Sequence, residues 1–234
     1  MNKILYIFIA ALLISCTKKE KPEGNLELIV NVEGLSQGKI YLLKQKDTSL
    51  IVLDSTIIKG NSNFTKYLNI SEPEMMYLFL DRGQTQSIDN SLPFFAEQGK
   101  ITINTTLKEF FAAAKISGSK NNDIIRKFDT INQKFIEKNL ELTQIKLQSD
   151  IGKIKINTDS LQSEFDKLKI KKYRYTAHFA KTHSNYEASP YLVLKEIPDI
   201  NISYLDTIYQ SLSPKVATSF YGKMLKEHIE KTKK

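Results

Sequence analysis

Cysteine is nearly absent from this chain of 234 residues, which contains one, Cys16. A single cysteine excludes an intramolecular disulfide, a C-x-x-C redox pair and a zinc site built from cysteines. Tryptophan is absent, and glycine, proline and histidine are scarce, at nine, six and three residues. Because disulfides are excluded, a hydrophobic core must stabilise the folded state. The 12 Phe and 11 Tyr supply large side chains for that core.

One long apolar run is present, from Ile4 to Ile14, between Lys3 and the lone cysteine. Its length fits the apolar part of a secretory signal, about 7–15 residues, and is short of the roughly 20 that a spanning helix needs. Leu13-Ile14-Ser15-Cys16 resembles the bacterial lipobox. That resemblance implies cleavage before Cys16, a diacylglyceryl group on its thiol and a fatty acyl group such as palmitate on its new amine. The alternatives are an uncleaved N-terminal anchor or an ordinary signal.

We therefore expect a signal peptide over residues 1–15 and a lipidated, flexible tether over residues 16–24, which contains Pro22. The partner implied by the anchor is a membrane, because several acyl chains hold a protein stably. Thr17 and not aspartate follows Cys16, so no clear inner-membrane retention signal is present. The expected location is the Gram-negative cell envelope, at the outer membrane and facing the periplasm.

The net charge is +8, but the positive residues are spread along the chain. The densest runs are Lys169 to Lys172 and Lys231 to Lys234. This pattern indicates a solvated surface with some attraction to anionic lipid headgroups. Export argues against a nucleic-acid partner.

Residues 25–118 have the pattern of short strands separated by turns. Apolar residues alternate in several segments: 26–30, 38–43, 50–58, 64–70, 75–80 and 100–104. Glycines and asparagines lie between them, as at Gly34 and Gly60-Asn61. Such spacing predicts an antiparallel β-sandwich or a partly open barrel.

Residues 119–234 have a helical period instead. Apolar side chains from Ile124 to Ile145 recur every three or four residues, which predicts a helix that Asn121 or Asn122 could cap. Further helices are expected from Thr158 or Asp159, from Ser189-Pro190, over 202–212, and from Ser213-Pro214 to the end. The predicted fold class is α+β, with a β-sandwich or open barrel followed by a helical region.

No motif for catalysis or cofactor binding is found. His178 and His183 are five residues apart, His228 is distant, and no H-E-x-x-H is present. Ser117-Gly118-Ser119 is better interpreted as a turn and helix cap than as a nucleophile elbow. Asp54-Ser55-Thr56 has no histidine tied to it. We therefore predict no catalytic, cofactor-binding or metal-binding residue and no enzyme activity.

Four tripeptides combine aspartate, a hydroxyl residue and a third residue in the pattern used for O-glycosylation of some exported bacterial proteins. They are Asp54-Ser55-Thr56, Asp129-Thr130-Ile131, Asp159-Ser160-Leu161 and Asp206-Thr207-Ile208. Modification needs an exposed hydroxyl. So loose a pattern also occurs by chance, and aspartate next to serine is common at helix starts.

Five segments in order resemble an uncharacterised domain of exported Gram-negative lipoproteins, the domain of unknown function 4369. They are 38–42, 53–56, 60–64, Pro93 to Gly99 and Ile116 to Ser119. In most members, the helical stretch that follows leads into a thioredoxin-like domain with a C-x-x-C pair. Here the sequence ends where that domain would begin, so the resemblance implies no catalytic residue.

Three hypotheses follow. The first is a lipid-anchored, non-enzymatic interaction or substrate-presenting module of the envelope. The second is an accessory to a separate thioredoxin-like thiol–disulfide oxidoreductase. The third is an enzyme with an unrecognised hydrolytic or carbohydrate site, which requires a pocket with convergent polar groups and carboxylates of shifted pKa.

Overall fold

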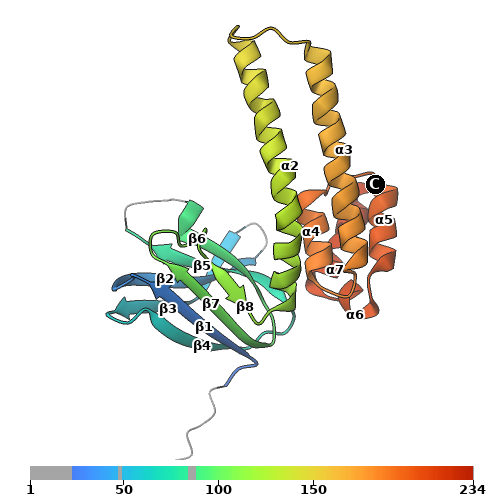
Figure 1. The fold of residues 1–234 in the computed structure, drawn as a ribbon. Helices are drawn as coiled ribbons and strands as arrows, with labels where there is room; N and C mark the ends of the chain where they lie inside the picture. Colours follow the sequence, from blue (N-terminus) through green and yellow to red (C-terminus); the bar gives the residue numbers. More distant parts are fainter. Residues whose placement is uncertain (1–22, 47–48, 84–87, 234) are drawn as a thin grey trace, which may run out of the picture.

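The computed structural model describes residues 23–46, 49–83 and 88–233 and consists of a β-sandwich beside a body of helices (Figure 1). The predicted signal peptide, Cys16 and the tether up to Pro22 lie outside the described residues, so lipidation at Cys16 stays a prediction. In the part of the chain that is described, no helix is both long and apolar enough to cross a membrane.

Two four-stranded sheets form the sandwich. The first contains β1 (Leu26–Glu33), β4 (Asn63–Leu68), β7 (Gly99–Thr106) and β8 (Lys115–Ser117), in the order β4-β1-β7-β8. The second contains β2 (Gln37–Lys46), β3 (Ser49–Lys59), β5 (Glu74–Asp81) and β6 (Ser91–Ala96), in the order β3-β2-β5-β6; a short 3-10 turn, η2 (Ile88–Asn90), precedes β6.

The alternation of apolar residues explains why these segments pair as a sandwich. Leu26, Leu28, Val30 and Val32 of β1 are fully buried, while the residues between them stay half-exposed. The inner faces of both sheets meet in one apolar core. Because side chains alternate between the two faces of a strand, every second side chain points into this core.

The predicted α+β class is confirmed, and the β-rich part consists of two separate four-stranded sheets that do not close into a barrel. Among the described strands one pair differs from the antiparallel expectation, because β1 runs parallel to β7 with Leu26 opposite Gly99. The sequence analysis also missed β6 and β8. Pro93 obscured β6, but an edge strand tolerates proline, and β8 is only three residues long.

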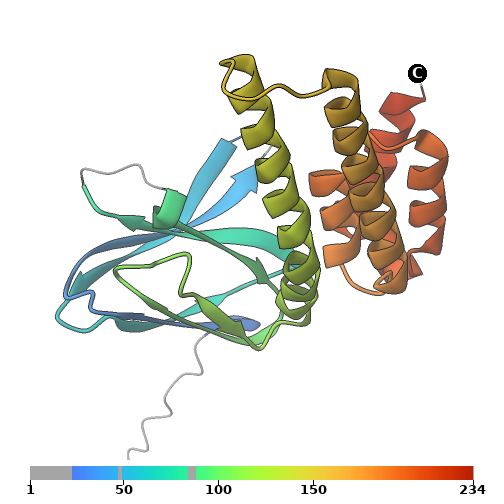
Figure 2. The same ribbon diagram turned by 45° about the horizontal axis from the view of Figure 1, so that its top comes forward.

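Six helices follow: α2 (Lys120–Asp150), α3 (Thr158–Thr182), α4 (Ala188–Glu196), α5 (Ile202–Ser211), α6 (Pro214–Ala217) and α7 (Phe220–Thr232). In Figures 1 and 2, α2 lies between the sandwich and the other helices. The far halves of α2 and α3 extend beyond the rest of the molecule as a helical hairpin (Figure 1).

Two predictions of helix ends were wrong. Ser119, and not Asn121 or Asn122, caps α2, because its Oγ accepts a hydrogen bond of 3.1 Å from the Asn122 amide. The expected last helix from Ser213 is two helices, since Ser219 caps α7 through the Gly222 amide and α6 ends at Ala217. The predicted start at Thr158 agrees with α3, which Asn157 caps.

A second apolar cluster joins the two parts of the molecule. It is formed by Met75, Phe95, Ile124, Phe128, Phe179, Ala188, Leu192 and Tyr221. Phe95 of β6 is fully buried, with its ring edge-on to Tyr191 at 5.8 Å between centroids. The sandwich therefore supplies one wall of the helical core.

Candidate functional site

The outer face of the second sheet is apolar and only partly covered. Strand pairing places Val52 opposite Leu43, and Ser55 opposite Tyr41, which itself faces Phe79. Since Ile40 and Leu42 between them point into the core, these side chains lie on the outside. We name the apolar residues of this face the outer sheet surface: Tyr41, Leu43, Leu50, Val52, Ile57 and Phe79.

Strand β3 contributes the most exposed part of this surface. Leu50, Val52 and Ile57 are 50%, 57% and 65% exposed, and Leu53, beside the bulge in the β2–β3 pairing, is 41% exposed. A strand of 11 residues with four exposed large apolar side chains is uncommon in a protein without a partner. Exposure on this scale indicates a contact surface.

The two edge strands of the second sheet, β6 and β3, differ in how their backbone groups are covered. At β6, the Phe95 amide donates to Asn122 Oδ1 at 2.8 Å, and Asn122 Nδ2 donates to the Phe95 carbonyl at 3.0 Å. The asparagine thus covers that edge with the start of α2. At β3, in the described chain, a charged side chain reaches the edge only near its middle. There Lys66 pairs with Asp54 at 2.8 Å and donates to the Ser55 carbonyl at 3.4 Å.

A hollow of about 760 Å³ adjoins the N-terminal end of β3. Ile51, Met75, Phe220 and Met224 supply its apolar wall, and α7 forms one side. Charged residues surround it, with ion pairs Lys44–Glu74 at 3.4 Å and Lys223–Glu72 at 3.9 Å, all drawn from the sandwich and α7. Hollows at the junction of two structural parts are common binding sites.

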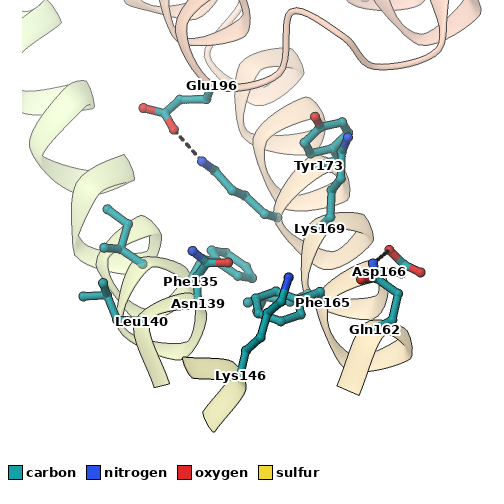
Figure 3. A pocket seen from close by; sticks show the side chains of 13 residues that line it. Phe135, Asn139, Leu140, Lys146, Gln162, Phe165, Asp166, Lys169, Tyr173 and Glu196 are labelled. Carbon is teal, nitrogen blue, oxygen red and sulfur yellow. Dashed lines mark hydrogen bonds and ion pairs between the residues drawn. The ribbon is translucent and has the colours of Figure 1, made fainter. Parts of the chain in front are cut away.

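A second hollow, of about 610 Å³, lies between α2 and α3 in the helical hairpin (Figure 3). Phe135 of α2 and Phe165 of α3 lie between the two helices, whereas Leu140 lines the outer rim of the hollow on α2. Its inner end is closed by Glu196, which pairs with Lys172 at 2.8 Å. Apolar side chains line the groove together with polar ones, among them Asn139, Lys146 and Gln162, and its inner end is charged.

Carboxylates with a shifted pKa were the expected mark of a catalytic site. Desolvation raises the pKa of Asp129, the nearby Lys195 opposes this, and the charge of Glu196 adds to it. Glu196 is itself held by Lys172 and by the amide of Asn132 at 3.4 Å. These contacts tie α2, α3 and α4 together, so the cluster has a structural role that accounts for its charges.

The histidines and the Ser117–Ser119 turn, which the sequence analysis considered as candidate site residues, do not come together in one site. His183 stacks on Phe179 at 4.0 Å, His228 contacts the Pro198 carbonyl at 2.7 Å, and His178 is exposed. Within residues 23–46, 49–83 and 88–233, no group of three or more His, Cys, Asp or Glu side chains is placed to hold a metal ion. Gly118 and Ser119 form the predicted turn and cap.

The four Asp-Ser/Thr tripeptides all lie in regular elements. Asp54-Ser55-Thr56 is half-buried in β3, while Thr130, Ser160 and Thr207 are exposed on α2, α3 and α5. The hydroxyls of Thr130 and Thr207 donate to the backbone carbonyls of Arg126 and Ser203 at 2.9 and 2.7 Å. Their glycosylation stays a prediction.

The sequence analysis missed the outer sheet surface and the asparagines that join the two parts. The run Leu50-Ile51-Val52-Leu53 carried a signal, because apolar residues without alternation cannot all face one core. Asn121 carried none: its side chain donates to Glu97 and Glu187 and accepts from the Ala188 amide, partners 24 to 67 residues away.

The structure is a β-sandwich with an attached helical body and an apolar sheet face that the helices cover only in part. Residues 23–125 match the family described as a domain of unknown function (DUF4369). The N-terminal part of the chain is therefore a domain of this family, as the resemblance implied. The match ends just inside α2, so it includes the whole sandwich. No curated protein matches the chain.

Proposed function

We propose that this protein is a lipid-anchored, non-enzymatic interaction module of the bacterial cell envelope. The outer sheet surface binds an extended segment of another envelope protein beside β3. The anchor in this proposal rests on the lipobox-like Leu13 to Cys16. The binding role rests on the geometry of the second sheet.

The observation that carries the proposal is the contrast between the two edges of that sheet. Asn122 covers β6 with two hydrogen bonds, whereas β3 has no second neighbouring strand among the described residues. An edge strand presents unpaired N–H and C=O groups, and an extended peptide satisfies them by adding a strand. The backbone of the peptide then supplies affinity, and alternate side chains supply specificity.

The chemistry of the occupant follows from the surface. Val52 and Ile57 are exposed on the outer face, so a segment with apolar residues at alternate positions extends that face. We expect the charged residues of the bound segment to lie away from the middle of β3, because Lys66 already donates a hydrogen bond to the Ser55 carbonyl there. Binding is therefore expected along the half of β3 between Ser49 and Leu53, next to the hollow.

Two observations support a module without enzyme activity. The carboxylate of Glu196 is engaged in joining helices, and the candidate histidines contact backbone carbonyls or a ring, or lie exposed. Asp129, the carboxyl whose pKa desolvation raises, lines neither described hollow.

Site-specific photo-crosslinking in intact cells tests the proposal. A photoreactive residue at Val52 is expected to capture a specific protein, which mass spectrometry identifies together with the crosslinked segment. The matched control is the same residue at Lys115, which is exposed on β8 at the far edge of the other sheet. Equal yields at the two positions would contradict a binding role for β3.

The identity of the captured protein separates this module from the second hypothesis. Capture of a thioredoxin-like protein with a C-x-x-C pair at Val52 would make the chain an accessory of a thiol–disulfide oxidoreductase. Capture of envelope or transport components without such a pair favours a structural or binding lipoprotein.

A further inference from the structure

Helix α2 has an apolar stripe that its own chain leaves uncovered. The stripe consists of Ile136, Leu140 and Leu147 on α2 and of Ile151, the C-cap residue directly after the helix; they are 43%, 61%, 59% and 64% exposed. At about 100° per residue, these four side chains lie within an arc of roughly 60°. The buried stripe of Phe128 and Leu142 faces a different direction. A helix that is apolar on two faces packs against neighbours on both.

The residue types and spacings of the uncovered stripe read the same from either end of the stripe. Its spacings are four, seven and four residues, and its order is Ile, Leu, Leu, Ile. A two-fold axis between Thr143 and Gln144 therefore places Leu140 opposite Leu147 of a second copy. The same axis places Ile136 opposite Ile151. Such self-complementarity is what a two-fold symmetric contact requires.

The part of α2 that α4 leaves uncovered is long enough for the whole stripe to contact a second α2 helix. The stripe spans 15 residue steps, about 22 Å of helix. Toward the sandwich, α4 covers the next turn, where Glu196 reaches Asn132. In the antiparallel arrangement the second α2, which ends at Asp150, brings its C-cap residue Ile151 opposite Ile136. It therefore stops just before it would meet α4.

The groove in the hairpin adds to the same surface. Ile136 and Leu140 belong both to the stripe and to the wall of the 610 Å³ hollow (Figure 3). A helix lying on the stripe closes the α2 side of this groove. Two hairpins joined in this way place the two α2 helices side by side and antiparallel, each still packed on its own α3 through another face.

We infer that the occupant of this surface is a second copy of the chain, bound through an antiparallel contact between the two α2 helices. This dimer uses neither β3 nor the outer sheet surface. It therefore goes beyond the proposed function, and each can fail without the other.

Disulfide formation between engineered cysteines tests the dimer and its register. Full-length copies with Leu140→Cys and with Leu147→Cys, carrying different tags, are produced together in intact cells and oxidised. The inferred contact predicts a Leu140→Cys to Leu147→Cys disulfide about tenfold more abundant than any formed by Ile170→Cys. Ile170 is a matched control, since it is 50% exposed on the same hairpin. The unaltered chain measures any background from Cys16.

Two outcomes of this experiment would overturn the inference. One is no crosslink above the Ile170→Cys control. The other is a dominant disulfide between two Leu140→Cys copies, which indicates a parallel contact.

A second measurement avoids oxidation. Leu140→Glu combined with Leu147→Glu is expected to convert the detergent-solubilised dimer to monomer by sedimentation, with an unchanged circular dichroism spectrum. Ile170→Glu is expected to leave the dimer intact. A folded double variant that still sediments as a dimer contradicts the α2 contact.

Discussion

The backbone amide of Met75 donates a hydrogen bond of 3.0 Å to the hydroxyl oxygen of Tyr221, 146 residues later in the chain. Met75 lies on β5, just past the stretch where β2 pairs with it, and Tyr221 lies in the first turn of α7. Tyr221 is 8% exposed, and burial raises its pKa far above the usual value. The last helix therefore completes the bonding of a sandwich strand.

Tyr221→Phe is expected to lower the free energy of unfolding by about 1–2 kcal/mol, because it leaves the buried Met75 amide without its acceptor. Since this contact joins the two parts, we expect one cooperative transition at a lower denaturant midpoint. Chemical denaturation followed by both circular dichroism and tyrosine fluorescence measures this. An unchanged midpoint would show that the contact contributes nothing.

Gly118→Ala is expected to destabilise the protein strongly, by more than about 2 kcal/mol. Gly118 has a φ of +91°, and an added Cβ would lie 1.9 Å from the Lys100 carbonyl oxygen. Gly152→Ala is the matched control, since Gly152 has a φ of +71° and nothing lies within 4 Å of its Cβ position. Gly152→Ala is expected to lower the free energy of unfolding by only about 1 kcal/mol, the cost of a positive φ for a residue with a Cβ. Similar losses in thermal melts of the two variants contradict the close approach at Gly118.

Asp89→Asn is expected to reduce stability at neutral pH by about 1 kcal/mol, and this loss is expected to shrink as the pH falls below the unfolded pKa of about 3.9. Partial burial acts to raise the pKa of Asp89, but the amides of Phe111 and Phe110, at 2.9 and 3.0 Å, and Arg82 outweigh it and lower the pKa. A carboxyl with a lowered folded-state pKa stabilises the fold above its unfolded pKa. This stabilisation is lost as the pH falls toward the folded value.

Denaturation of both proteins from pH 3 to pH 7 measures this difference. Asp150→Asn is the control, since Asp150 is exposed at the end of α2 and has no ion pair within the described part of the chain. A loss for Asp89→Asn that does not change with pH would show that the carboxylate charge is not involved.

The fold class was predictable because strand and helix periods are local properties of the sequence. The alternation in β1 and the stripe through Ile124 and Phe128 both face the core as expected, whereas Ile131 in the same stripe is 36% exposed. The pairing of β1 with β7 and the contacts of Asn121 were not predictable, since both join segments remote in sequence. The run from Leu50 to Leu53 carried a signal of an apolar outer face on β3, but it could not show that the face stays exposed, because exposure depends on which elements pack over a strand.

Val52→Lys is expected to abolish partner capture while changing the free energy of unfolding by less than about 0.5 kcal/mol. Val52 is 57% exposed, so a lysine fits there without disturbing the core. The charge, however, makes the edge a poor neighbour for an apolar strand. Co-purification of the partner found by crosslinking, with thermal melts in parallel, measures both effects. A variant that retains the partner at full yield would move the binding site away from β3.

The measurement that tests the central claim most directly is photo-crosslinking from Val52 in intact cells, with Lys115 as the control position. The account predicts one dominant captured protein, joined through an extended segment with alternating apolar residues. Capture at Lys115 with equal yield and the same product, or no product at Val52, would contradict a binding role for the outer sheet surface.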